Sequence, residues 1–140
     1  MSNIRPYTDA LERLRGAALR PTRQRMALTR LLFDGDDRHV TAEALYREAR
    51  AADVRVSLAT VYNTLHQFTA AGLLREVVVD ATRSYFDTNT GDHHHFYCAD
   101  TGMLTDIPGD TISVGDLPPP PKGTRVDRVD VVVRVHQNGD

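Results

Sequence analysis

Hydrophobic residues in the first 72 positions recur every three or four residues, which predicts four short amphipathic helices. Each predicted helix has a serine or threonine at its start that is the predicted N-cap: Thr8, Thr22, Thr41 and Ser57. Gly72 is predicted to end the fourth helix in a left-handed conformation. The predicted inward-facing stripes are Leu11, Leu14 and Ala18; Leu28, Leu31 and Leu32; Ala44, Leu45 and Ala49; and Leu58, Val61, Leu65 and Phe68.

The pattern changes from helix to strand after Gly72. Two strand-like runs, at residues 74–79 and 83–88, flank a polar turn at residues 80–82, which predicts a hairpin. A hairpin directly after a helix-turn-helix is typical of a wing, so residues 57–71 are the predicted recognition helix. Small polar and ring-bearing side chains form its outward face: Thr60, Tyr62, Asn63, Thr64, His66 and Gln67. Such a face fits a DNA major groove, and the alternative is an ordinary solvated helix side.

The second half of the chain contains three strand-like runs, at residues 94–98, 102–107 and 126–135. Valine alternates along the last run, which predicts one buried face. Between the second and third runs lies a segment with four consecutive prolines, residues 118–121, which argues against a long helix. Three short strands bury little apolar surface alone, so we expect this half to complete its core against a second copy of the chain.

The composition is that of a globular protein, with 41% apolar and 26% charged residues. No apolar run approaches the roughly 20 residues that span a bilayer, and the first residues show no export signal, so the expected location is the cytoplasm. Cys98 is the only cysteine, which excludes an internal disulfide and a four-thiolate zinc site.

The net charge of −2 hides an asymmetry between the two halves. Residues 1–83 hold 13 Lys and Arg against 10 Asp and Glu, whereas residues 84–140 hold 4 against 9. Arg20, Arg23 and Arg25 lie upstream of the predicted recognition helix. The basic half therefore suits contact with phosphate.

The sequence contains three consecutive histidines, His93, His94 and His95, and this segment is the strongest candidate for a ligand-binding site. On a strand, His93 and His95 project to one face and His94 to the other. His93 and His95 can therefore bind the same metal ion. Imidazoles with carboxylates suit Zn(II), Fe(II) or Mn(II). The alternative is a polar strand entrance that binds nothing.

Four motifs make the chain resemble the Fur superfamily of ferric uptake regulators. They are R-P-T-R-Q-R at residues 20–25, H-V-T-A-E-A-L-Y at 39–46, S-L-A-T-V-Y-N-T-L at 57–65 and H-H-H-F-Y-C at 93–98. The resemblance implies an α+β fold: an N-terminal winged helix-turn-helix domain, here residues 1–88, followed by a small α/β dimerisation and sensing domain, residues 89–140. It also implies a regulator that binds palindromic operator DNA as a homodimer.

The family's functional residues map onto positions of this sequence. The implied regulatory metal site is His39, Asp87, His93, His95 and Asp106. The implied DNA contacts are Arg20, Arg23, Ser57, Thr60, Tyr62 and Asn63. Aspartates stand where close relatives usually carry glutamates, which shortens the reach of each carboxylate by one methylene.

Two departures narrow the resemblance. The paired C-x-x-C motifs of the family's structural zinc site are absent, and the proline-rich segment replaces a long dimerisation helix. These losses, with the histidine run, are similar to the Irr subgroup of iron response regulators. That similarity implies haem as the signal at His93, His94 and His95, and ferrochelatase as a partner that delivers it.

Other interpretations of the histidines stay open. A peroxide sensor of the same superfamily would hold Fe(II) with histidine and aspartate ligands. A small metalloenzyme would use the histidines and Asp87 around a catalytic ion, although no nucleophile accompanies them. A metal-buffering or purely structural dimer would have no affinity for DNA.

Overall fold

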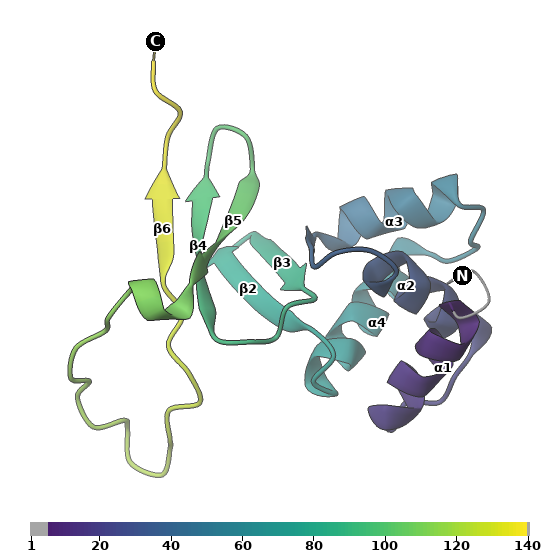
Figure 1. Ribbon diagram of the computed structural model, residues 1–140, viewed down its shortest axis with the longest axis horizontal. Helices are drawn as coiled ribbons and strands as arrows, with labels where there is room; N and C mark the ends of the chain where they lie inside the picture. Colours follow the sequence, from purple (N-terminus) through teal and green to yellow (C-terminus); the bar gives the residue numbers. More distant parts are fainter. Residues whose placement is uncertain (1–5, 140) are drawn as a thin grey trace. The chain divides into compact units, whose positions relative to one another are not determined.

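The computed structural model describes residues 6–139, and its contacts divide the chain into two compact units (Figure 1). The first unit ends at Thr90 and the second begins at Gly91. Each unit is described by itself. Within the described range, no helix has the length and apolar character needed to cross a membrane.

Four helices make up most of the first unit: α1 (Pro6–Gly16), α2 (Arg23–Phe33), α3 (Ala42–Ala51) and α4 (Leu58–Ala70). Three of the predicted N-caps are confirmed, since the hydroxyls of Thr22, Thr41 and Ser57 accept backbone N–H bonds of 3.2, 3.1 and 3.0 Å. The predicted cap at Thr8 is wrong, because α1 already begins at Pro6. Proline suits a first helical position, where its missing N–H costs no hydrogen bond.

The helices share one apolar core. Its buried members are Leu14, Leu28, Leu32, Val40, Ala42, Leu45, Ala49, Val61, Leu65, Phe68, Leu74 and Phe86. Five predicted members lie outside this buried cluster, and three of them, Leu11, Leu31 and Ala44, are half-buried. Ala18 is exposed because α1 ends before it, and Leu58 is 37% exposed because it occupies the first turn of α4.

A three-stranded antiparallel sheet completes the first unit, with strand order β1-β3-β2. The predicted hairpin forms as β2 (Arg75–Asp80) and β3 (Arg83–Asp87). At its turn, the Asp80 carboxylate accepts 2.9 Å bonds from the N–H and hydroxyl of Thr82, and these lower the pKa of Asp80. The third strand, β1 (His39–Val40), has only two residues, so no alternation of apolar and polar residues could have predicted it.

The second unit is built on a three-stranded sheet of order β5-β4-β6. Strand β4 (His93–Cys98) pairs antiparallel with β5 (Met103–Pro108) and parallel with β6 (Val132–Val135). The 3-10 turn η2 (Gly109–Thr111) follows β5, and residues 112–131 contain neither helix nor strand. The predicted third strand, residues 126–135, is much shorter because only its last four residues pair with β4.

The two faces of this second sheet differ in chemistry because side chains alternate along each strand. One face carries the buried side chains of His93, His95 and Tyr97. The opposite face, which we call the apolar sheet face, carries Phe96, Cys98, Met103, Val133 and Val135. Phe96 is 41% and Met103 65% exposed, so this face is only partly covered within the chain.

Three helices of the first unit end in the same hydrogen-bonded motif. In each, the second residue beyond the C-cap donates its N–H to a carbonyl five residues back: Leu19 to Leu14, Val54 to Ala49, and Leu73 to Phe68, at 2.8–2.9 Å. The residue before each donor has a positive φ, and these residues are Ala18 (59°), Asp53 (61°) and Gly72 (85°). Only Gly72 is a residue without a steric penalty there.

We predict that Ala18→Gly raises the free energy of unfolding by about 1 kcal/mol, because glycine removes the steric cost of the left-handed conformation at the end of α1. Urea denaturation followed by circular dichroism would measure the change. The matched control is Ala51→Gly at an exposed position within α3, which should destabilise the protein. An unchanged or lowered free energy of unfolding in Ala18→Gly would contradict the prediction.

Candidate metal centre and DNA-binding helix

In the first unit, pairing of β1 with β3 sets His39 directly opposite Asp87. The His39 Nε2 lies 3.2 Å from the Asp87 Oδ2, and the Asp87 side chain is only 1% exposed. The Asn89 N–H donates a 2.9 Å bond to the other oxygen, Oδ1. A buried carboxylate needs such partners to offset its lost hydration. The pair therefore supplies one imidazole and one oriented carboxylate.

The short strand β1 is held in place mainly by Arg38. Its N–H donates to the Thr88 hydroxyl at 2.9 Å, and the Thr88 N–H donates back to the Arg38 carbonyl at 3.0 Å. Its guanidinium forms a two-bond ion pair with Glu48 of α3 and donates to the Leu31 carbonyl at 3.2 Å. Arg38 thus fixes the backbone next to His39.

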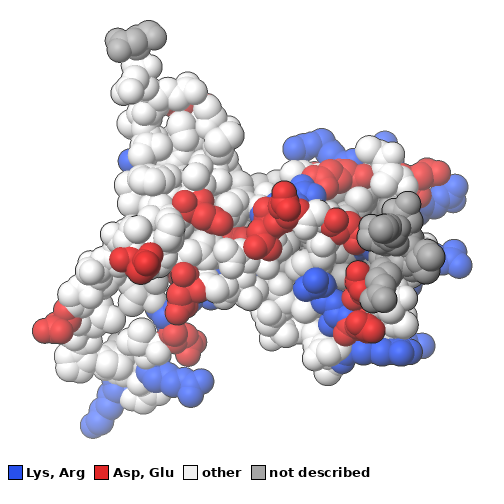
Figure 2. Space-filling view, viewed as in Figure 1, with Lys and Arg blue, Asp and Glu red and all other residues white. Residues whose placement is uncertain are grey.

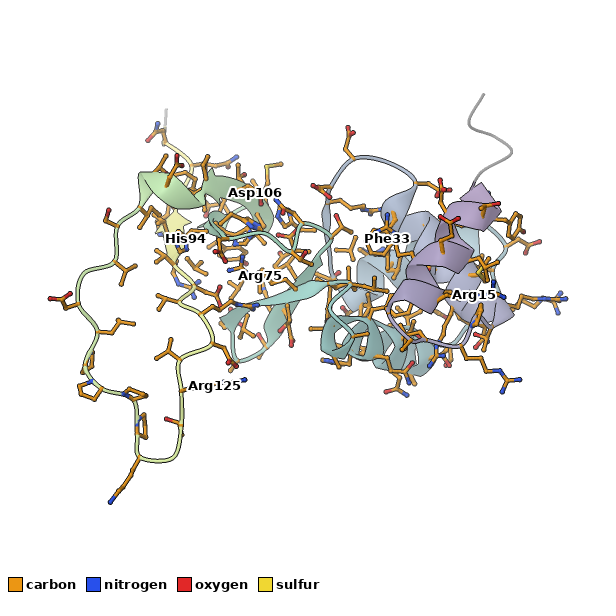
Figure 3. All side chains as sticks on the ribbon, turned by 60° about the horizontal axis from the view of Figure 1, so that its bottom comes forward. Arg15, Phe33, Arg75, His94, Asp106 and Arg125 are labelled. Carbon is orange, nitrogen blue, oxygen red and sulfur yellow. The ribbon has the colours of Figure 1, made fainter. Side chains whose placement is uncertain are left out.

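In the second unit, His93, His95 and Asp106 converge on one face of the sheet. Both histidine Nε2 atoms lie 3.4 Å from the Asp106 Oδ1, and the two ring centroids are 4.5 Å apart. One ligand atom from each of the three residues lies within 4.8 Å of the others. His93 is 5% and His95 1% exposed, whereas Asp106, labelled in Figure 3, is 40% exposed.

The protonation of His93 can be inferred from its second ring nitrogen. Its Nδ1 lies 2.7 Å from the Gly91 carbonyl oxygen, which can only accept, so Nδ1 carries the proton. In the neutral ring, Nε2 then presents a lone pair toward the carboxylate oxygen of Asp106. Two acceptors that face each other repel unless a proton or a cation lies between them. A backbone carbonyl behind the ring is also the usual support of a metal-bound histidine.

The donor chemistry fits a divalent ion of intermediate hardness. Imidazole nitrogens with carboxylate oxygens suit Zn(II), Fe(II) or Mn(II). Cys98 lies on the apolar sheet face, outside this group, and hydrogen bonding by Thr101 lowers the pKa of its thiol. The predicted ligands are therefore found as an imidazole–carboxylate pair in the first unit and a group of three in the second.

His94, the middle histidine of the run, points away from the group of three (Figure 3). The Val131 N–H donates a 3.1 Å bond to its Nδ1, which helps to hold the chain at the start of β6. The predicted haem residues are thus divided by strand alternation, with His93 and His95 on one face and His94 on the other.

The predicted DNA-contacting residues lie on α4 and at its N-cap, and at or just before the start of α2. Arg20, Arg23, Tyr62 and Asn63 are exposed and available to a ligand. The hydroxyls of Ser57 and Thr60 bond to each other at 2.9 Å while Ser57 caps the helix. Figure 2 shows basic side chains around the helical unit with acidic ones among them.

Arg75 was not singled out from the sequence, and Arg25 and His66 make contacts that the sequence did not predict. Arg25 donates 2.9 Å bonds to the Arg20 carbonyl and to the Gln67 side chain, which ties the start of α2 to α4. Arg75 is buried opposite Asp87 on β2. His66 stacks between Tyr62 and Phe86. Only the helical spacing of residues 62 and 66 gave a signal in the sequence, because the other contacts join distant segments.

Comparison with known proteins gives a consistent result. The model of the ferric uptake regulator family matches residues 16–116. The ferric uptake regulation protein of Bordetella parapertussis is 38% identical over 92 residues, 65% of this chain and 66% of that protein. The peroxide-responsive repressor PerR of Staphylococcus aureus (strain Mu50) is 34% identical over 99 residues, 71% and 66% of the two chains. Each match spans just under two thirds of the relative's length.

A solved structure extends the similarity to the fold. The ferric uptake regulator of Pseudomonas aeruginosa, solved with manganese, superposes with a TM-score of 0.68 and 28% identity, covering 91% of this chain and 97% of that one. The predicted fold class, an N-terminal winged helix-turn-helix followed by a small unit of the dimerisation type, is confirmed.

We predict that Gly109 of η2 is needed to position His93 in the candidate metal centre. A Cβ there would lie 2.5 Å from the Asp92 carbonyl oxygen and 3.7 Å from the His93 Cα. Gly109→Ala should therefore push the backbone that carries His93 and weaken Mn(II) binding by roughly tenfold or more. Electron paramagnetic resonance of free Mn(II) would measure the affinity.

The control is Gly115→Ala in the same unit, since a Cβ at that position meets no atom within 4 Å. It should bind Mn(II) like the wild type. Wild-type affinity in Gly109→Ala would show that this contact does not position His93.

Proposed function

This chain belongs to the ferric uptake regulator family, and we propose that it is a metal-responsive transcription regulator, not an enzyme, that binds palindromic operator DNA as a homodimer. The observation that carries the proposal is the combination of a winged helix with exposed polar residues on α4 and a histidine–carboxylate centre in the same chain.

The DNA-binding part of the proposal rests on the first unit. The exposed side chains of Tyr62 and Asn63 on α4 are suited to base edges in a major groove. The arginines at positions 20 and 23 are suited to phosphate. Ser57 and Thr60 contribute through the helix N-terminus, where backbone N–H groups also attract phosphate.

The dimer part rests on the apolar sheet face of the second unit. Phe96 and Met103 are 41% and 65% exposed, and the neighbouring valines of β6 are half-buried. A second copy that covers this face would remove the apolar side chains from water and give the two-fold symmetry that a palindrome requires.

The metal part of the proposal joins the two groups of ligands. His39 and Asp87 offer two ligands, and the second unit offers three, whereas these divalent ions take about four to six. We therefore propose that one ion is shared by the five residues His39, Asp87, His93, His95 and Asp106. Each aspartate would supply a carboxylate oxygen, and His93 would bind through Nε2 with its Nδ1–H on Gly91.

Sharing one ion between units would make DNA binding depend on metal. An ion that needs ligands from both units stabilises only those arrangements in which both groups reach it. In a dimer, the arrangement of each first unit sets the distance between the two α4 helices, and operator binding requires a spacing that matches successive turns of the DNA.

Iron is the proposed signal, either as the ion or as haem. The Irr-type similarity assigns haem to His93, His94 and His95. Because of strand alternation, haem would be held either by His94 on one face or by His93 and His95 on the other, and only the second choice would compete with the metal. Ferrochelatase as haem donor belongs to this haem alternative.

Peroxide sensing is the second candidate, favoured by the 34% identity to a peroxide-responsive repressor. Fe(II) held by these ligands would supply reactivity toward peroxide, and His39 or His93 would be the imidazole that is oxidised. Transfer of one oxygen atom to the ring would oxidise the histidine by two electrons and reduce the peroxide to water. The altered ring would bind metal more weakly, and the operator would be released.

The first test is DNA affinity of the full chain measured without metal, with Mn(II) and with haem, on duplexes that the Mn(II)-loaded protein selects from a random library. We expect tighter binding with Mn(II) than without. Arg23→Ala should weaken binding to all duplexes and reduce the slope of log affinity against log salt by about 1, because one phosphate contact is lost.

Arg125→Ala is the matched control, because Arg125 belongs to the second unit and its side chain is 91% exposed. It should leave affinity and salt slope unchanged. If the metal-loaded wild type selected no duplex at all, the transcription-regulator proposal would be wrong and metal buffering would take its place.

The signal is tested by two spectroscopic measurements. Haem sensing predicts that titration of the protein with haem shifts the Soret band, and that this shift is lost when all three histidines of the run are replaced by Ala. If haem competes with metal, His94→Ala alone should retain the shift. Peroxide sensing predicts one added oxygen at His39 or His93 by mass spectrometry of the Fe(II) form. No shift in the wild type, or the same shift in the triple variant, contradicts the haem alternative.

A further inference from the structure

Three aromatic rings of the first unit form a row from the surface of α4 into the core. The rings of Tyr62 and His66 stack at a centroid distance of 5.9 Å with an interplanar angle of 23°. The ring of His66 then meets that of Phe86 edge-to-face at 5.3 Å and 85°. These distances lie in the range in which aromatic pairs attract each other.

The inner end of this row is buried, whereas its outer end and the His66 side chain in the middle are exposed. Phe86 on β3 is 1% exposed, belongs to the core cluster and pairs across the sheet with Val40. Tyr62 is 40% exposed. Its position four residues before His66 places the two side chains on the same side of α4, one turn apart.

We propose that His66, itself packed against Phe86, is a positioning residue that holds the Tyr62 ring in one orientation by stacking on it, and so contributes to the sequence specificity of α4. This inference rests on the proposed DNA binding by α4. A tyrosine without a neighbour samples several rotamers and loses that freedom on binding. With His66 behind it, the ring is ordered before DNA arrives.

The row also connects the recognition helix to the strand that carries a candidate metal ligand. Phe86 directly precedes Asp87 on β3, and alternation directs the two side chains to opposite faces. Within this row, the ring of Phe86 on β3 is contacted by the side chain of His66 on α4. A single ring, that of His66, therefore separates Phe86 from Tyr62.

The test compares His66→Ala with His66→Phe in the full chain, using duplexes selected by the wild type. Loss of the ring should weaken binding to the preferred duplex by roughly threefold to tenfold and reduce discrimination against base changes at the position that Tyr62 contacts. Phenylalanine retains a ring of similar size and should restore both. His136→Ala, an 80% exposed histidine of the second unit, is the matched control.

A double-mutant cycle with Tyr62→Ala separates positioning from a direct role of His66. In the Tyr62→Ala background, His66→Ala should have no further effect on affinity. An equal loss in both backgrounds, or wild-type affinity and discrimination in His66→Ala, would overturn the inference.

A measurement without DNA distinguishes failure of this inference from failure of the proposed function. Three-bond couplings in NMR report the side-chain rotamers of Tyr62, which should be a single state in the wild type and in His66→Phe and averaged in His66→Ala. Averaged couplings in the wild type would refute positioning. Absence of DNA binding with ordered couplings would refute only the proposed function.

Discussion

Side-chain alternation along β3 and β4 is the constraint on which both candidate sites depend. On β3, the two-residue period sends Phe86 into the core and Asp87 to the opposite face beside His39. On β4, the same period brings His93 and His95 together at Asp106 and turns His94 away. A shift of one residue in either pairing would exchange these faces and dismantle the ligand groups. The hydrogen-bonded registers of the two sheets therefore decide which candidate ligands come together.

Side-chain hydrogen bonds and one close backbone approach stabilise those registers. Arg38 ties β1 to β3 through Thr88 and to α3 through Glu48, although β1 itself is only two residues long. Gly109 lets η2 approach the backbone before His93 more closely than any other residue would allow. Such supports lie outside the ligand set, yet a metal site is sensitive to them because its bonds tolerate little displacement.

Much of the first unit could be predicted because helix signals are local. The caps at Thr22, Thr41 and Ser57, the stop at Gly72 and the hairpin after it all follow from residue types at fixed spacing. Errors occurred where a neighbour decides. Thr8 is not a cap because Pro6 begins the helix earlier. The last predicted strand shortens to Val132–Val135 because only these residues pair with β4, while the Val131 N–H donates to the His94 side chain instead.

The sequence by itself determined the recognition helix, the residue types able to bind a divalent ion, and the exclusion of a four-thiolate zinc site, because each depends on residue identity and short spacing. Tertiary structure decided which of those residues meet. It placed His39 against Asp87, 48 positions away, and set His66 between a surface tyrosine and a core phenylalanine. It also showed His94 to be engaged with Val131 on the far face of its sheet. Contacts of this kind come from strand pairing and core packing between distant segments, and no local pattern in the chain encodes them.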